Sequence, residues 1–133
     1  MTTIEHNGAR LAYLIRSGDH EPGLRFFSRD SDYVQVGTWG YARGQTLLPH
    51  VHNVVPRLAD RTQEVVHLLR GRLRASLFDD DGRPVTQVEL GAGDTLVLLA
   101  GGHGYEILED DTRVLEIKNG PYAGAEADRR RIA

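Results

Sequence analysis

The chain has 133 residues and no cysteine, which excludes disulfide bonds and thiolate ligands, so nitrogen and oxygen atoms must hold any metal. It has no apolar run near the roughly 20 residues that a membrane-spanning helix needs. Its first residues show neither the basic leader nor the apolar stretch of a signal peptide. An excess of positive charge is also missing, since the formal net charge is −3. We therefore expect a cytoplasmic protein with no nucleic-acid partner and no membrane partner.

Helical patterning is scarce, because no segment of about ten or more residues repeats its apolar side chains at the helical period. Short apolar runs instead alternate with turn residues, and 15 glycines are spread along the chain. The length suits one hydrophobic core, so residues 1–133 are expected to form a single all-β domain, a sandwich or a barrel. The expected strands are 32–43, 45–55, 64–69, 72–78, 85–90, 94–100, 105–108 and 112–118, with a turn at 78–84.

Two histidines stand two positions apart within residues 47–55, LLPHVHNVV. Residues i and i+2 of a strand share one face, so His50 and His52 would project side by side. Two adjacent imidazoles on a rigid strand are suited to metal binding. The simpler interpretation is a pair of half-exposed histidines near the end of a strand.

Glycines and further polar residues extend this pair into two motifs. The first reads G-x5-H-x-H, a spacer and E-x6-G, from Gly44 to Gly71. The second is GAGDTLVLLAGGHGYEIL, in which an apolar run lies between two glycine turns and is followed by His103. Together they resemble the two motifs of the cupin superfamily, over about residues 33–118. The resemblance implies a double-stranded β-helix, the cupin-type jelly-roll barrel, with short N-terminal strands and a C-terminal tail around this core.

The resemblance also implies a metal site, because cupins hold a metal with the two histidines and the glutamate of the first motif and the histidine of the second. By position, the metal ligands are His50, His52, Glu64 and His103. The chain departs from the family in its eleven-residue spacer before Glu64, which is longer than usual, and in Ile107, which stands where the family has Asn. Three imidazoles and one carboxylate suit a divalent first-row ion (Mn, Fe, Ni, Zn or Cu) and leave positions open for water or substrate.

More narrowly, the runs RTQE, GGHG and NGPY are similar to those of small bacterial cupins with no assigned activity, which lie near surface-polysaccharide genes. The partner implied by this resemblance is a small-molecule ligand or substrate, with a link to sugar or polysaccharide metabolism.

Other side chains are candidates for roles around the predicted metal. Tyr105 shares a face with His103 by alternation, and its phenol could serve as a catalytic proton donor or simply fill the barrel. Arg57 and Arg61 lie in the long spacer and could bind a carboxylate or phosphate of the substrate, or remain solvated. His67 falls three positions after Glu64, which places it on the opposite face of that strand.

Two aromatic residues, Trp39 and Tyr41, share a strand face and fit either the core or a dimer interface. We expect a homodimer.

Three functions are compatible with these residues. The first is a metal-dependent enzyme acting on a small polar metabolite, as an isomerase, a lyase or a dioxygenase. The second is a metal-free isomerase or epimerase of nucleotide-linked sugars, in which the histidines act as bases. The third is a non-catalytic module that binds a small ligand.

Overall fold

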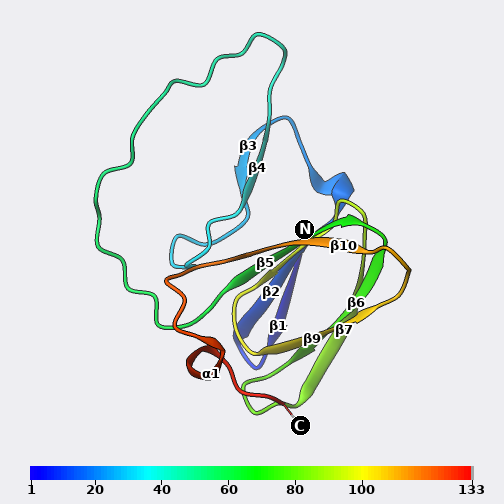
Figure 1. Ribbon diagram of the computed structural model, residues 1–133. Coiled ribbons are helices and arrows are strands. Elements are labelled where there is room, and N and C mark those ends of the chain that lie inside the picture. The colour runs from blue at the N-terminus through cyan, green and yellow to red at the C-terminus, as the bar shows by residue number, and fades with distance from the viewer. Residues whose placement is uncertain (133) are drawn as a thin grey trace.

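The computed structural model describes residues 1–132 and shows an all-β protein with three antiparallel sheets (Figure 1). The largest sheet has the order β1-β2-β8-β5-β10, with β1 Thr2–His6, β2 Ala9–Ile15, β8 Thr95–Leu98, β5 Glu64–Arg70 and β10 Arg113–Lys118. The second has the order β7-β6-β9, with β7 Pro84–Gly91, β6 Arg72–Phe78 and β9 Gly102–Ile107. Strands β3 Gly23–Phe26 and β4 Gly37–Gly40 form a separate hairpin. A 3₁₀ turn at Ser17–Asp19 and helix α1 Ala125–Asp128 complete the fold.

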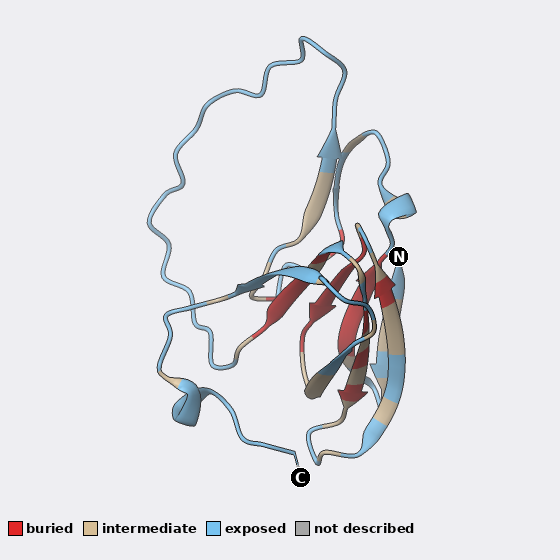
Figure 2. Ribbon diagram, turned by 45° about the vertical axis from the view of Figure 1, so that its right-hand side comes forward, coloured by how far each residue is buried: buried red, intermediate tan, exposed pale blue. Residues whose placement is uncertain are grey.

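The five-stranded and three-stranded sheets pack face to face, because each alternates apolar residues toward the other. The shared core contains residues from both sheets: Ala12, Leu14, Val66, Leu68, Leu96 and Leu98 from the first, and Leu73, Ala75, Leu77 and Leu90 from the second. Figure 2 shows that the buried residues are concentrated in these strands, whereas the β3–β4 hairpin is largely exposed.

The opposite face of the five-stranded sheet carries a smaller core. Tyr13, Ile15, Val65 and Val97 lie there and pack with Phe27 and Leu99. The large sheet is therefore apolar on both faces. Strand β2 contributes to both cores from the second position of the sheet, so the N-terminal strands are an integral part of the structure.

Most of the expected strands are present, with small shifts at their ends. The expected turn at 78–84 connects β6 to β7, and a hydrogen bond from Asp79 N–H to Arg83 C=O closes it. Two expectations were wrong. The expected strand at 32–43 is reduced to β4, and the expected strand at 45–55 is absent, since residues 41–63 carry no strand. These residues run as a wide arc away from the sheets (Figure 1).

The arc has strand-like composition but finds no partner at its own end of the large sheet. The strand that follows it, β5, is already paired on one edge with β8 and on the other with β10. Pro49 and Pro56 also remove two backbone donors from the segment. Local propensity alone does not make a strand when no ladder is available.

Across residues 1–132, no helix is both long and apolar enough to cross a membrane.

Candidate functional site

Glu64 is the first residue of β5 and points between the two packed sheets. Alternation along the strand places it on the same face as Val66 and Leu68, which belong to the shared core. The residue is 7% exposed, so its carboxylate is largely removed from water. Burying a charged group without compensation is costly, so its surroundings must stabilise it.

His103 reaches Glu64 from the opposite sheet. It lies on β9 and pairs with Leu77 of β6, whose side chain is part of the shared core. Its Nε2 atom is 3.0 Å from Oε2 of Glu64. Two of the four predicted ligands, from different strands and different sheets, thus lie next to each other.

Three further side chains surround this pair. The ring of Tyr105 lies 5.4 Å from that of His103, measured between centroids, and Tyr105 pairs with the buried Ala75. The carboxyl group of Glu116, on the neighbouring strand β10, influences the pKa of Glu64. Lys118 is the register partner of Glu64, and its Nζ atom is 3.7 Å from Oε1 of Glu116.

Sequence reasoning missed Glu116 and Lys118. Alternation along 112–118 does place Val114, Glu116 and Lys118 on one face of a strand. What the sequence does not show is that this strand pairs with β5 and sets Lys118 opposite Glu64. The two residues were missed because strand pairing depends on segments that are far apart in the sequence.

The pKa values of the two glutamates in the site, Glu64 and Glu116, are shifted in opposite directions. Burial disfavours the ionised form of Glu64, but hydrogen bonds from His103 and Glu116 outweigh it, and the pKa of Glu64 falls to about 2. The pKa of Glu116 is raised, mainly by its hydrogen bond with Glu64 and then by burial. Two ionised carboxylates are both hydrogen-bond acceptors and cannot hydrogen-bond to each other, so one of them must be protonated. Glu116, which has the higher pKa, keeps the proton more readily than Glu64 does.

The phenol of Tyr105 is held in its neutral form. Burial, followed by the negative charges of Glu64 and Glu116, raises the pKa of Tyr105 above its ordinary value. A protonated phenol beside an imidazole can donate a hydrogen bond or a proton to a bound molecule.

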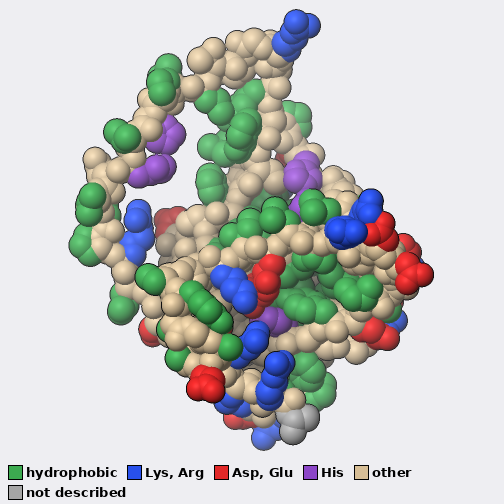
Figure 3. All heavy atoms as spheres, in the orientation of Figure 1, with side chains coloured by type: hydrophobic (Ala, Val, Ile, Leu, Met, Phe, Trp, Pro, Cys, Tyr) green, Lys and Arg blue, Asp and Glu red, His purple; other side chains and the backbone are tan. Residues whose placement is uncertain are grey.

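The remaining predicted ligands, His50 and His52, lie elsewhere. They are exposed on the 41–63 arc, with ring centroids 5.0 Å apart. The arc itself stands away from the sheets (Figure 3). The structure therefore brings His50 to His52 and Glu64 to His103, but it does not join the two pairs. Within residues 1–132, no three His, Cys, Asp or Glu side chains are placed to share one metal ion.

The predicted substrate-binding arginines are also separated. Arg57 is exposed on the arc, whereas Arg61 lines a hollow beside Arg10 and Arg29. His67 points away from Glu64, as alternation predicted, and its Nδ1 atom lies 2.9 Å from Thr95 Oγ1.

One atom in the site has no amide, imidazole or hydroxyl donor. Oε1 of Glu64 is buried and accepts no hydrogen bond from an N–H or hydroxyl group among the described residues, which leaves the carboxyl group of Glu116 as its neighbouring polar group. A buried carboxylate oxygen beside an imidazole nitrogen has the donor chemistry of a first-row metal site, so Glu64 and His103 fit such an ion as two of its ligands.

Comparison with models of known protein families, with curated proteins and with solved structures finds no match for this chain.

Proposed function

We propose that the protein is a cupin-type jelly-roll barrel and a metal-dependent enzyme that acts on a small polar metabolite. The observation that carries the proposal is the buried Oε1 atom of Glu64, which accepts no hydrogen bond from an N–H or hydroxyl group, beside His103. An atom of this kind costs about 1–3 kcal/mol unless something binds it, and a divalent cation would do so directly. A bound cation would supply Lewis-acid polarisation of a substrate oxygen.

The chain's own residues have distinct roles around such an ion. Glu64 and His103 would hold it from opposite sheets. Tyr105, whose phenol stays protonated, would donate a hydrogen bond or a proton to the substrate. Lys118, next to Glu116, would attract a negatively charged group at the open side of the site.

His50 and His52 are proposed as the other two ligands. They are already close to one another, and both imidazoles are exposed. Completing the site requires the 41–63 arc to close toward β5 and β9. An arc with exposed Leu48, Val51 and Val54 side chains gains apolar burial by closing, which favours this movement.

Metal analysis tests the proposal. Protein purified without a nickel column, then dialysed against each first-row ion in turn, should retain about one ion per chain by inductively coupled plasma mass spectrometry. Glu64→Gln, His103→Ala and His50→Ala should each lower retention at least about tenfold. His67→Ala is the matched control, because this histidine faces away from Glu64. Retention at background level in the unaltered protein would refute the proposal.

A second function is favoured by the contact between His103 and Glu64 itself. A carboxylate that holds an imidazole beside a neutral phenol is an acid–base arrangement that needs no metal. It suits isomerisation or epimerisation of a nucleotide-linked keto sugar. Turnover of such sugars that survives a chelator and is lost in His103→Ala would support this function. Turnover abolished by the chelator and restored by one ion would favour the metal enzyme.

We further propose a homodimer formed through the β3–β4 hairpin. Trp39 and Tyr41 stack with ring centroids 6.0 Å apart, yet Trp39 is 64% exposed. Leu24 pairs directly with Trp39, and Phe26 follows on the same face, so four large apolar side chains share one exposed surface.

A further inference from the structure

A hollow of about 310 Å³ lies on the side of the large sheet that faces away from the Glu64–His103 site. Its walls include Gln63 and Leu99, whereas the neighbouring Glu64 points to the shared core. The charged side chains in its lining are Arg10, Arg29, Arg61 and Asp32. Three guanidinium groups therefore line the hollow, and the carboxylates of Glu5, Asp32 and Asp60 lie beside Arg10, Arg29 and Arg61 respectively.

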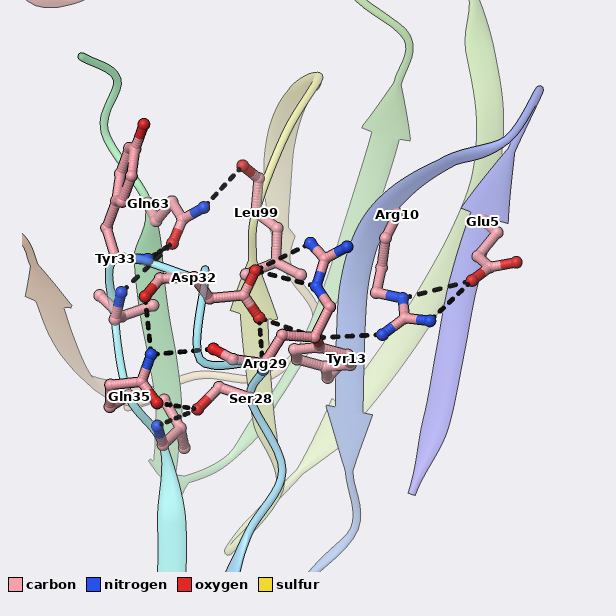
Figure 4. A network of polar contacts seen from close by, with 12 residues as sticks. Glu5, Arg10, Tyr13, Ser28, Arg29, Asp32, Tyr33, Gln35, Gln63 and Leu99 are labelled. Atoms are coloured by element: carbon pink, nitrogen blue, oxygen red, sulfur yellow. Dashed lines mark hydrogen bonds and ion pairs between the residues drawn. The ribbon is translucent and has the colours of Figure 1, made fainter. Parts of the chain in front are cut away.

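Asp32 serves to position one of these arginines. Its side chain is 2% exposed, and its Oδ2 atom accepts hydrogen bonds from the Tyr13 hydroxyl at 2.9 Å and the Arg29 backbone N–H at 2.8 Å. Its Oδ1 atom accepts hydrogen bonds from the Arg29 side chain, from Nη2 at 2.8 Å and from Nε at 3.2 Å (Figure 4). One edge of the Arg29 guanidinium is thereby fixed, and Nη1 keeps its donors for another molecule.

Arg10 is held in a similar way from the other side of Tyr13. Its Nε and Nη2 atoms each lie 3.2 Å from Oε1 of Glu5, and Nη1 donates to the Tyr13 hydroxyl at 3.4 Å (Figure 4). A guanidinium carries five N–H donors, so two remain after these three bonds. The Tyr13 hydroxyl thus links both arginines into one fixed network.

Arg61 is the least engaged of the three. Its Nε atom approaches Asp60 only to 3.8 Å, and its side chain is 56% exposed. The Asp60 carboxylate is instead occupied by the Tyr33 hydroxyl at 2.6 Å. Arg61 is therefore available to close over a ligand that the two fixed arginines already hold.

We propose that this hollow is an anion site that takes the dianionic phosphate group of a small metabolite. Arginine forks match the geometry of phosphate oxygens, and the N–H donors left free on Arg10, Arg29 and Arg61 are enough to bind several oxygens of one phosphate group. The site does not rest on the metal proposal, because it uses none of the predicted metal ligands and lies on the other face of the sheet.

Isothermal titration calorimetry at constant ionic strength tests this, with inorganic phosphate and glycerol 3-phosphate as separate probes. Saturable binding of at least one of them is expected, with a Kd below about 1 mM. Tighter binding of glycerol 3-phosphate would identify a phosphorylated metabolite as the natural ligand, and tighter binding of inorganic phosphate would identify the free ion. No saturation by either probe up to about 20 mM would overturn the proposal.

Substitutions locate the binding. Arg61→Gln and Arg10→Gln should each weaken binding about tenfold. Arg83→Gln is the matched control, because Arg83 is an exposed arginine paired with a neighbouring aspartate, as Arg61 is, but lies outside the hollow. Arg29→Gln is not used, since it would leave the buried Asp32 without its partner. Equal affinities in Arg61→Gln, Arg10→Gln and Arg83→Gln would place the phosphate elsewhere and overturn the assignment.

Discussion

The imidazole Nε2 of His103 lies 3.0 Å from the carboxylate Oε2 of Glu64, although the two residues belong to strands of different sheets. This contact connects the two packed layers through polar atoms at a point where both present otherwise apolar side chains. It follows that the stability of the sandwich depends on the ionisation of Glu64.

Acid should destabilise the metal-free protein in a defined window. The pKa of Glu64 is lowered in the fold from 4.5 to about 2, so its stabilising contribution is complete above pH 4.5 and is lost as the pH falls toward 2. The loss should amount to roughly 3 kcal/mol of unfolding free energy. Urea denaturation at a series of pH values in chelator measures it, and Glu64→Gln should flatten the profile below pH 4.5.

Glu116 serves as a control, because its contribution to the unfolding free energy should change with pH in the opposite direction to that of Glu64. Its pKa is raised by the hydrogen bond with Glu64, so its contribution is complete below pH 4.5 and is lost as the pH rises through its raised value in the fold. Glu116→Gln should therefore remove a decline above pH 4.5 and leave the acid limb in place. An acid limb that is unchanged in Glu64→Gln would show that other carboxylates set the pH dependence.

The sequence predicted the local side-chain pattern well, and it failed where pairing between distant segments decides the outcome. Alternation placed Glu64 and His67 on opposite faces of one strand, and the structure confirms this. Alternation also favoured a strand for LLPHVHNVV, but the edges of β5 are taken by β8 and β10. Lys118 was missed for the same reason, because only the β5–β10 register sets it opposite Glu64.

Replacement of Gly71 by alanine should be among the more destabilising single changes. Gly71 joins β5 to β6 with φ of +87°, and an added Cβ would overlap Thr112, lying 2.7 Å from its Cα. Gly44 has a similar φ of +93° but nothing within 4 Å of the Cβ position. We expect Gly71→Ala to cost roughly 2–4 kcal/mol, and Gly44→Ala about 1 kcal/mol. Equal melting temperatures for the two variants would contradict the proposed steric conflict.

The Tyr13 hydroxyl should contribute to stability far more than that of Tyr33. Tyr13 is fully buried and donates to the buried Asp32, so Tyr13→Phe leaves that carboxylate one donor short and should cost about 1–3 kcal/mol. Tyr33 donates to the exposed Asp60, where water can replace it, so Tyr33→Phe should cost less than about 0.5 kcal/mol. Chemical denaturation of both variants gives the comparison, and a larger loss in Tyr33→Phe would reverse this interpretation.

The apolar surface of the β3–β4 hairpin should control self-association. Four large side chains share it, and a charge at its centre would have to be buried without a partner if the surface were covered. We expect sedimentation velocity to give twice the 14.8 kDa mass of one chain for the unaltered protein and a single-chain mass for Trp39→Asp. Tyr122→Asp is the matched control, because Tyr122 is also a largely exposed aromatic residue but lies near the C-terminus, outside the hairpin. If the unaltered protein is monomeric, or if both variants dissociate it equally, the hairpin is not the interface. Only an interface centred on Trp39 predicts that Trp39→Asp dissociates the dimer and Tyr122→Asp does not.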